Sequence, residues 1–433
     1  MNLLPILILI PVAASIIEYL LTRLKINYDG IVPLVSSISS LGLSIYAILK
    51  LQPLFSIPWI SRWGINYSLG LNGISNIFIV LLSFVFLMIT VLSLNKPKHR
   101  TYWYMNLLIQ ALVFNFILTQ DLVVRVISWE FIWIPAFIIL INTDRKHYSI
   151  KFSNIWFVAQ ALLISGTIIM IGRFSQIYNF AFWLFLIATL LRSYIRASER
   201  FDTEVSLITT VILPLLPIIF LINTILPTFQ YQIHANIQPI SIFICACIFI
   251  WILRLIASRS ISTISFSNMF IFSSLIIIWL LIPTVKIMQL CVQIIIAKTV
   301  LNVLLIYYGN KTPFSLNKWV FMLSLVLSFG FAGVVIGLPA AKLFSLWNIT
   351  QHQITVAMFS LFFVLFITTI IKMGALFNSE RTKAVPGQKW FEIVKLVTVC
   401  IIFLGVVVAS LDPSYLNQMV RNYHQTNISR GLQ

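Results

Sequence analysis

The stretch "DLVVRVISWEFIWIPAFIILIN", residues 121–142, places a carboxylic acid, Glu130, among aromatic and branched aliphatic residues. About 20 apolar residues are enough for a helix to cross a bilayer, and this stretch has that length. A charged side chain at the bilayer centre costs about 2.5–3.5 kcal/mol on insertion scales, so it is rare and is a functional candidate by default. The stretch therefore predicts a membrane-spanning helix with a functional acid at mid-depth.

The composition of the rest of the chain is also that of a membrane protein. Of 433 residues, 60% are hydrophobic and 9% are charged, whereas soluble domains carry about 25% charged residues. The apolar runs predict an all-α polytopic fold with about fourteen transmembrane helices. The first run lacks a basic start and a small-residue cleavage site, so we expect it to be a retained helix. The predicted spans lie near 3–22, 31–51, 75–95, 102–120, 122–142, 152–172, 180–197, 205–226, 240–257, 264–284, 286–308, 318–340, 354–378 and 391–410.

The net charge of +18 indicates topology and not a nucleic-acid partner. Connections after odd-numbered helices hold sixteen Lys and Arg residues, and connections after even-numbered helices hold six. By the positive-inside rule, the odd-numbered loops face the cytoplasm or matrix and both termini face the other side. The six are Lys50, Arg62, Arg125, Arg173, Lys286 and Lys342.

The sequence offers no ligand pattern for a metal or a redox cofactor. All four Cys residues lie in apolar runs, and their spacing matches no zinc or iron–sulfur motif. The five His residues lie in predicted loops or the tail, where none is suited to hold a haem within the membrane. We therefore expect no cofactor and no metal in this chain.

Four charges within the predicted spans are candidates for moving protons: Glu130, Arg192, Lys298 and Lys342. A buried carboxylate beside a cation can gain or lose a proton after a small rearrangement, which favours a proton or cation path. The alternative is a fixed ion pair that locks the packing of helices. The other charges in spans mostly lie nearer the ends, where long basic side chains can reach the interface; they are Glu18, Arg254, Lys372 and Lys395.

Several motifs together resemble subunit 4 of the proton-pumping NADH:ubiquinone oxidoreductase, complex I. "SWEFIWIPAFIILI" (128–141) resembles the signature of helix 5 in that family, an acid preceded by an aromatic residue and followed by Ile-Pro. "GINYSLGLNGISNIFIVLLS" (64–83) resembles the segment that enters helix 3, with Asn72 where an Asp is usual. "ISFSNM" (264–269) and "SLDPSYL" (410–416) are similar to the start of helix 10 and the end of helix 14.

The resemblance implies an antiporter-like fold with two inverted five-helix repeats, helices 4–8 and 9–13. It divides one transmembrane domain, 1–433, into helices 1–3 (1–100), a first repeat (102–226), a second repeat (240–378), helix 14 (391–410) and a polar tail (411–433).

The resemblance also implies a chain of titrating groups, from which this sequence departs. Glu130 matches the helix-5 Glu, and Arg192 stands at the position of the helix-7 Lys. Ile219 falls near the helix-8 Lys; Lys298 lies beside the helix-11 His position, and Lys342 is the one charge near that of the helix-12 Glu. Because Arg is effectively always protonated, Arg192 can act as a fixed counter-charge but not as a relay. The resemblance then predicts Glu130 as the principal titrating group, with Lys298 and Lys342 as substitute stations.

By resemblance, the expected function is that of a core membrane-arm subunit of complex I, which translocates protons as electrons pass from NADH to ubiquinone. FMN, the iron–sulfur clusters and ubiquinone are then expected in other subunits. Expected partners are neighbouring antiporter-like subunits, accessory subunits and lipids such as cardiolipin, but no nucleic acid. Divergence from the family pattern and frequent Ile, Phe and Asn favour a mitochondrial inner-membrane protein over one of bacterial origin, with odd-numbered loops in the matrix and both termini in the intermembrane space.

Other functions remain open from the sequence. Lys342 mimics a helix-12 Lys of complex I subunit 2, and multisubunit cation/proton antiporters share the expected fold. The missing helix-8 Lys and helix-12 Glu favour a structural membrane subunit that does not pump. A stand-alone solute carrier would need a cavity with convergent polar groups, and the sequence offers few candidates for one.

Overall fold

The computed structural model describes residues 2–25, 30–50, 52–94, 100–143, 147–172, 177–193 and 208–236, and single positions between 240 and 303. Its contacts define two compact units, Met1–Asn236 with Gln418–Gln433, and Ile237–Asn417. All elements named below lie in the first unit. Lys298, Lys342, helix 14 and the polar tail lie outside the described residues, as does the second repeat apart from those single positions.

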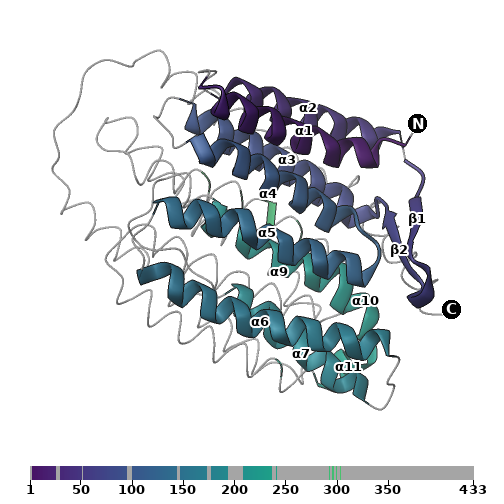
Figure 1. Ribbon diagram of the computed structural model, residues 1–433. Helices are drawn as coiled ribbons and strands as arrows, with labels where there is room; N and C mark the ends of the chain where they lie inside the picture. Colours follow the sequence, from purple (N-terminus) through teal and green to yellow (C-terminus); the bar gives the residue numbers. More distant parts are fainter. Residues whose placement is uncertain are drawn as a thin grey trace, which may run out of the picture. The chain divides into compact units, whose positions relative to one another are not determined.

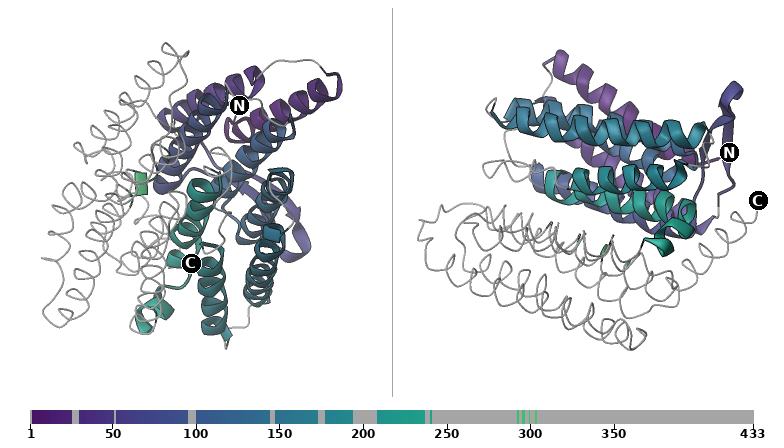
Figure 2. Two further views of the ribbon diagram at one scale, coloured as in Figure 1. Left: turned by 90° about the vertical axis from the view of Figure 1, so that its left-hand side faces the viewer. Right: turned by 90° about the horizontal axis from the view of Figure 1, so that it is seen from below.

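Long helices account for most of the described residues and lie side by side (Figures 1 and 2). They agree with the predicted spans to within a few residues at most ends. Five of the helices in the described part, α1 to α5, are long and apolar enough to cross a membrane. Large apolar side chains are exposed on α1, α2 and α6, as a lipid-facing surface requires. The helices are α1 (Leu4–Arg23), α2 (Ile31–Leu49), α3 (Gly73–Ser93), α4 (Arg100–Leu118), α5 (Leu122–Thr143), α6 (His147–Ile171) and α7 (Tyr178–Ser193).

The connection between α2 and α3 contains a β-hairpin. Strands β1 (Phe55–Ile60) and β2 (Ile65–Leu69) pair antiparallel around a short turn that ends at Gly64. Gly64 has a φ of +67°, a conformation that Gly adopts without steric cost. Directly after β2, Gly70 contacts the end of α4: its N–H donates to the carbonyl of Leu118 at 2.8 Å. The hairpin is therefore attached where α5 begins (Figure 1).

A capping carboxylate determines where α5 begins. Asp121 Oδ1 accepts hydrogen bonds from the backbone N–H groups of Val123 and Val124, at 2.8 and 3.2 Å. Such a side chain satisfies donors that the first turn of a helix leaves without partners. Because α5 spans Leu122–Thr143, Glu130 lies near the middle of the helix, as predicted.

The span predicted over 205–226 is an interrupted helix in the residues described. It consists of η3 (Ile208–Ile212, π-helical), α9 (Leu213–Phe220), η4 (Leu221–Ile225, π-helical) and α10 (Leu226–Thr228), followed by α11 (Gln230–Ala235). Proline has no N–H for the i→i−4 bond, and Pro214, Pro217 and Pro227 interrupt that ladder. Every residue from Val211 to Ile225 is buried, so this segment crosses the interior of the bundle.

Candidate functional site

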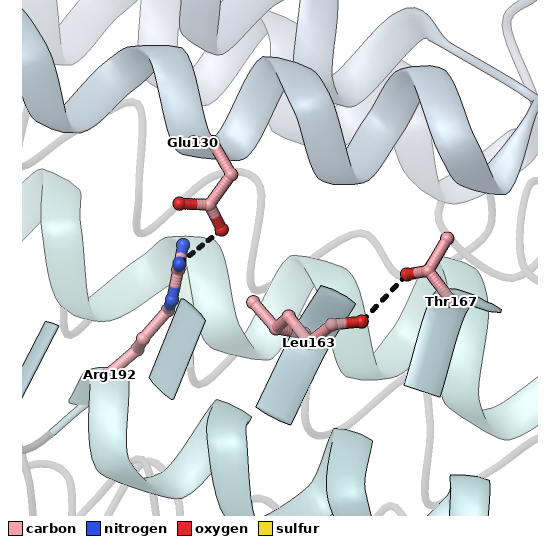
Figure 3. A network of polar contacts seen from close by, with 4 residues as sticks. All are labelled: Glu130, Leu163, Thr167 and Arg192. Carbon is pink, nitrogen blue, oxygen red and sulfur yellow. Dashed lines mark hydrogen bonds and ion pairs between the residues drawn. The ribbon is translucent and has the colours of Figure 1, made fainter. Parts of the chain in front are cut away.

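Helices α5 and α7 bring Glu130 and Arg192 into direct contact. Arg192 Nη2 donates to Glu130 Oε1, which joins residues 62 apart in the sequence (Figure 3). The side chain of Arg192 is 0% exposed and that of Glu130 is 16% exposed. The structure thus contains a buried ion pair at the middle of α5.

Helix α6 packs closely on α7, the helix that carries Arg192. A Cβ added at Gly166 of α6 would meet ring carbons of Phe185 at 3.2–3.3 Å, so glycine allows the close approach of the two helices. At the next residue of α6, Thr167 Oγ1 donates to the carbonyl of Leu163 at 2.7 Å (Figure 3). Its hydroxyl proton is thus used within its own helix, while the oxygen keeps a lone pair available as an acceptor.

Two tryptophans of α5 cover the guanidinium. The Arg192 Cζ lies 4.6 Å from the ring centroid of Trp129 and 5.8 Å from that of Trp133. Trp129 in turn packs on Phe220 of α9, with ring centroids 4.8 Å apart. A desolvated cation over an indole face is stabilised by about 2 kcal/mol. The arrangement therefore holds the charge of Arg192 in place beside Glu130.

The pair does not use all of its hydrogen-bonding capacity. Among the contacts of the described side chains, Glu130 Oε2 and the Nε and Nη1 atoms of Arg192 are buried without a hydrogen-bond partner. A carboxylate oxygen can accept a proton, and guanidinium N–H groups can hold a water molecule. Chemically, the site can bind a proton on Glu130 while a fixed positive charge stands beside it.

Replacing Trp129 by Leu is expected to destabilise the chain by about 1–3 kcal/mol, because both the stacked cation and the aromatic packing are lost. The midpoint of thermal unfolding of the purified native assembly measures this loss. Trp63→Leu is the matched control, since Trp63 lies on the hairpin with 63% of its surface exposed. Equal midpoints for the two variants would show that the stacked ring does not stabilise the pair.

The structure places the other sequence candidates as follows. Lys298 and Lys342 lie outside the described residues. Ile219, at the expected place of a helix-8 Lys, is fully buried in α9. Glu18, which the sequence placed among charges mostly near helix ends, is only 8% exposed. The structure therefore brings together Glu130 and Arg192, and their role in transport stays a prediction.

One placement made from the sequence is wrong. The count of basic residues grouped Arg125 with the connections between helices, whereas it lies inside α5, within the span predicted over 122–142, and is 3% exposed. Its guanidinium donates to Asn223 and Thr224 of the interrupted helix and to Thr119. Two features of the sequence could have indicated this: Asp121 is a typical helix cap, and Pro227 leaves a carbonyl that needs another donor.

A chain of polar contacts links Tyr67, on strand β2 of the hairpin, to α4 and α5. Tyr67 Oη donates to Asn115 Oδ1, and Asn115 Nδ2 donates to Ser128 Oγ, both at 2.7 Å. Burial raises the pKa of the Tyr67 phenol above its ordinary value, so Tyr67 remains a donor at neutral pH. In the part of the chain that the structure describes, no group of three or more His, Cys, Asp or Glu residues could hold a metal ion.

Comparison with known proteins gives sequence matches over part of the chain. A scan against protein-family models finds no match. Subunit M of the F420H2 dehydrogenase of Methanosarcina mazei is 29% identical over 172 residues, which cover 37% of this chain and 34% of that protein. Subunit M of the NADH-quinone oxidoreductase of Buchnera aphidicola is 25% identical over 199 residues, 41% of this chain and 39% of that protein. The matched stretches thus span less than half the length of these relatives.

Solved structures match over almost the whole chain. A chain of respiratory complex I from Thermus thermophilus superposes with a TM-score of 0.74 at 12% identity, covering 98% of this chain and 99% of that one. A chain of the Mrp complex from Dietzia sp. gives a TM-score of 0.76 at 14% identity, with 99% of each chain covered. The protein is therefore a multi-pass helical membrane protein with the antiporter-like fold found in complex I and Mrp complexes. Over part of its length, its sequence is similar to subunit M of the F420H2 dehydrogenase and to subunit M of the NADH-quinone oxidoreductase named above.

Proposed function

We propose that this chain is a core membrane-arm subunit of NADH:ubiquinone oxidoreductase, of the subunit 4 or M type, and that it contributes to proton translocation. The buried pair of Glu130 and Arg192 on α5 and α7 carries the proposal. The match to an NADH-quinone oxidoreductase subunit M supports it. The enzyme's redox chemistry, with FMN, iron–sulfur clusters and ubiquinone, is assigned to other subunits.

In this proposal Glu130 is the group that gains and loses the proton. Arg192 keeps its charge throughout, because a guanidinium is effectively always protonated in proteins. The attraction between the two charges falls as they separate, and it is stronger at low dielectric than in water. Opening the pair lets the acid take up a proton, and closing the pair releases it. Lys298 and Lys342 are proposed as further stations along the path.

The test is the ratio of protons pumped to electrons transferred when Glu130 is replaced by Gln. The amide keeps the size of the side chain and an oxygen that accepts from Arg192, but it cannot bind the transported proton. The ratio, measured in vesicles that contain the native complex, is expected to fall while NADH oxidation continues. Glu18→Gln, which removes another buried acid on α1, is the control and keeps the ratio. An unchanged ratio in Glu130→Gln refutes this role for the acid.

A second candidate from the same superfamily is a subunit of a cation/proton antiporter, which the fold of the Mrp complex supports. Purification of the native particle separates the two candidates. Flavin and iron–sulfur subunits that copurify with this chain favour complex I, and their absence favours an antiporter.

A non-pumping structural subunit is the third candidate. It is favoured by Ile219 in α9, where the family pattern has a Lys, and by an Arg in place of the helix-7 Lys. Water within the native assembly decides: a hydrated path between Glu130 and Lys298 favours transport, and a dry interior favours a scaffold.

For the compartment we propose the mitochondrial inner membrane, with both termini on the intermembrane-space side. Neighbouring antiporter-like subunits, accessory subunits and cardiolipin are the proposed partners. Crosslinking of the native particle tests these contacts.

A further inference from the structure

The interrupted helix 208–228 contains a carbonyl that its own helix cannot satisfy in the usual way. In a regular α-helix the carbonyl of Asn223 would accept from the N–H of residue 227, but residue 227 is Pro. One residue earlier, the Leu226 N–H donates to Leu221, five residues back, which is a π-helical step. The backbone around Asn223 therefore needs a donor from another helix.

Arg125 of α5 supplies that donor. Its Nη1 donates to the carbonyl of Asn223 at 2.9 Å and to Thr224 Oγ1 at 2.8 Å. Its Nη2 donates to the carbonyl of Thr119, in the turn that follows α4. A planar guanidinium can reach three such acceptors at once because its donors form a rigid fork, whereas the ammonium of Lys is a single point.

The local electrostatics explain why a cation is stable at this place. Arg125 lies in the first turn of α5, where the helix dipole is unfavourable to a positive charge. That cost is offset because the guanidinium lies on the carbonyl that ends α4, the negative end of that helix dipole. The carboxylate of Asp121 caps the same turn of α5. Arg125 therefore gains by contacting the two backbone carbonyls rather than pointing to lipid.

These contacts connect the interrupted helix to the helix that carries the ion pair. Arg125 and Glu130 lie on α5 five residues apart, about 7.5 Å along its axis. The interrupted helix also contacts other helices here. The side chain of Asn223 donates from Nδ2 to Ser75 Oγ of α3 at 3.4 Å, and Phe220 packs on Trp129 of α5. Arg125 thus joins the end of α4, the start of α5 and the π-helical turn η4.

We propose that Arg125 is a positioning residue. It caps the carbonyl of Asn223, which Pro227 leaves without its usual donor, and it holds the interrupted helix in a fixed position relative to α5, the helix that carries Glu130. This proposal rests on the proposed function only where proton pumping is concerned. The capping itself concerns the structure of 221–228 and is tested separately.

The first experiment measures amide hydrogen exchange of residues 221–228 and the thermal unfolding of the native assembly in four forms. These are the unchanged protein, Arg125→Met, Pro227→Ala and the double variant. Arg125→Met is expected to speed exchange in 221–228 and to lower the unfolding midpoint by about 5 °C, because a buried carbonyl loses its partner. In the double variant residue 227 has an N–H that can bond to Asn223, so exchange and midpoint return toward those of Pro227→Ala alone.

Arg62→Met is the matched control, since Arg62 is an exposed arginine in the turn of the hairpin; its loss leaves both quantities unchanged. Failure of Pro227→Ala to rescue Arg125→Met, or unchanged exchange in Arg125→Met, overturns the capping role.

The second experiment measures the ratio of protons pumped to electrons transferred in Arg125→Met and in Arg125→Lys. Both are expected to lower the ratio, Arg125→Met by more, while NADH oxidation continues. A normal ratio in Arg125→Met that has fast exchange in 221–228 overturns the link to Glu130 but not the capping. If Glu130→Gln also pumps normally, the proposed function itself has failed, and the exchange experiment still decides the capping role.

Discussion

Replacing Glu130 by Ala is expected to impair stable assembly of the native complex. The change leaves the fully buried guanidinium of Arg192 without its carboxylate partner. Breaking a buried ion pair by removing one partner costs about 3–5 kcal/mol, a large part of the roughly 5–15 kcal/mol that stabilises a typical protein. The amount of assembled complex, measured on native gels, is expected to fall several-fold.

A second change separates the cost of the unpaired charge from the loss of function. Replacing both charges, Glu130→Ala with Arg192→Met, removes the unpaired cation and is expected to restore assembly, because apolar replacement of a buried pair is often neutral. Proton pumping is expected to stay low in this double variant, since no titrating group remains at the site. If Glu130→Ala assembles as well as the unchanged chain, or if the double variant assembles no better than Glu130→Ala, the unpaired charge of Arg192 is not what destabilises the complex.

Replacing Arg192 by Lys is expected to give proton pumping a new dependence on pH. A buried Lys can lose its proton in the physiological range or above, whereas Arg cannot. Once the ammonium is neutral, Glu130 has no counter-charge, so pumping by Arg192→Lys should fall as the pH rises. The unchanged chain keeps the charge on residue 192, so its ratio of protons pumped to electrons transferred should not fall as the pH rises, even where electron transfer itself slows. The measurement is the ratio of protons pumped to electrons transferred at several pH values.

Arg192→Met serves as the comparison, because it lacks the charge at every pH and its pumping should be low throughout. An alkaline profile of Arg192→Lys that matches that of the unchanged chain would mean that the charge on residue 192 does not control Glu130.

The long helices of the described part could be predicted from the sequence because each is a continuous apolar run of membrane-spanning length. The hairpin β1–β2 was not predicted. The residues of β2, INYSL, do alternate apolar and polar side chains, but strands of five or six residues are a weak signal, and the position of the hairpin depends on contacts with Leu118 and Gln120. The π-helical turns were also missed. The prolines in 208–228 are typical of a disturbed helix, but which hydrogen bonds replace the lost ones depends on neighbouring helices.

The candidate site was predictable in part for a similar reason. Glu130 could be identified because an acid in the middle of an apolar run is rare. Arg192 could be identified because the resemblance aligned it with a cation of the family. Arg125 was misplaced because a basic residue near the end of a span usually indicates the interface. Only the three-dimensional contacts with Asn223 and Thr119 show that it is buried and paired.

The most direct measurement follows the protonation of the Glu130 carboxyl during turnover. Infrared difference spectra of the native complex, recorded between resting and NADH-driven states, detect the C=O band of a carboxylic acid that gains or loses a proton. We predict such a band in the unchanged complex, and its absence in Glu130→Gln while the other bands remain. A spectrum in which Glu130→Gln removes no carboxyl band would contradict the claim that this buried acid carries protons.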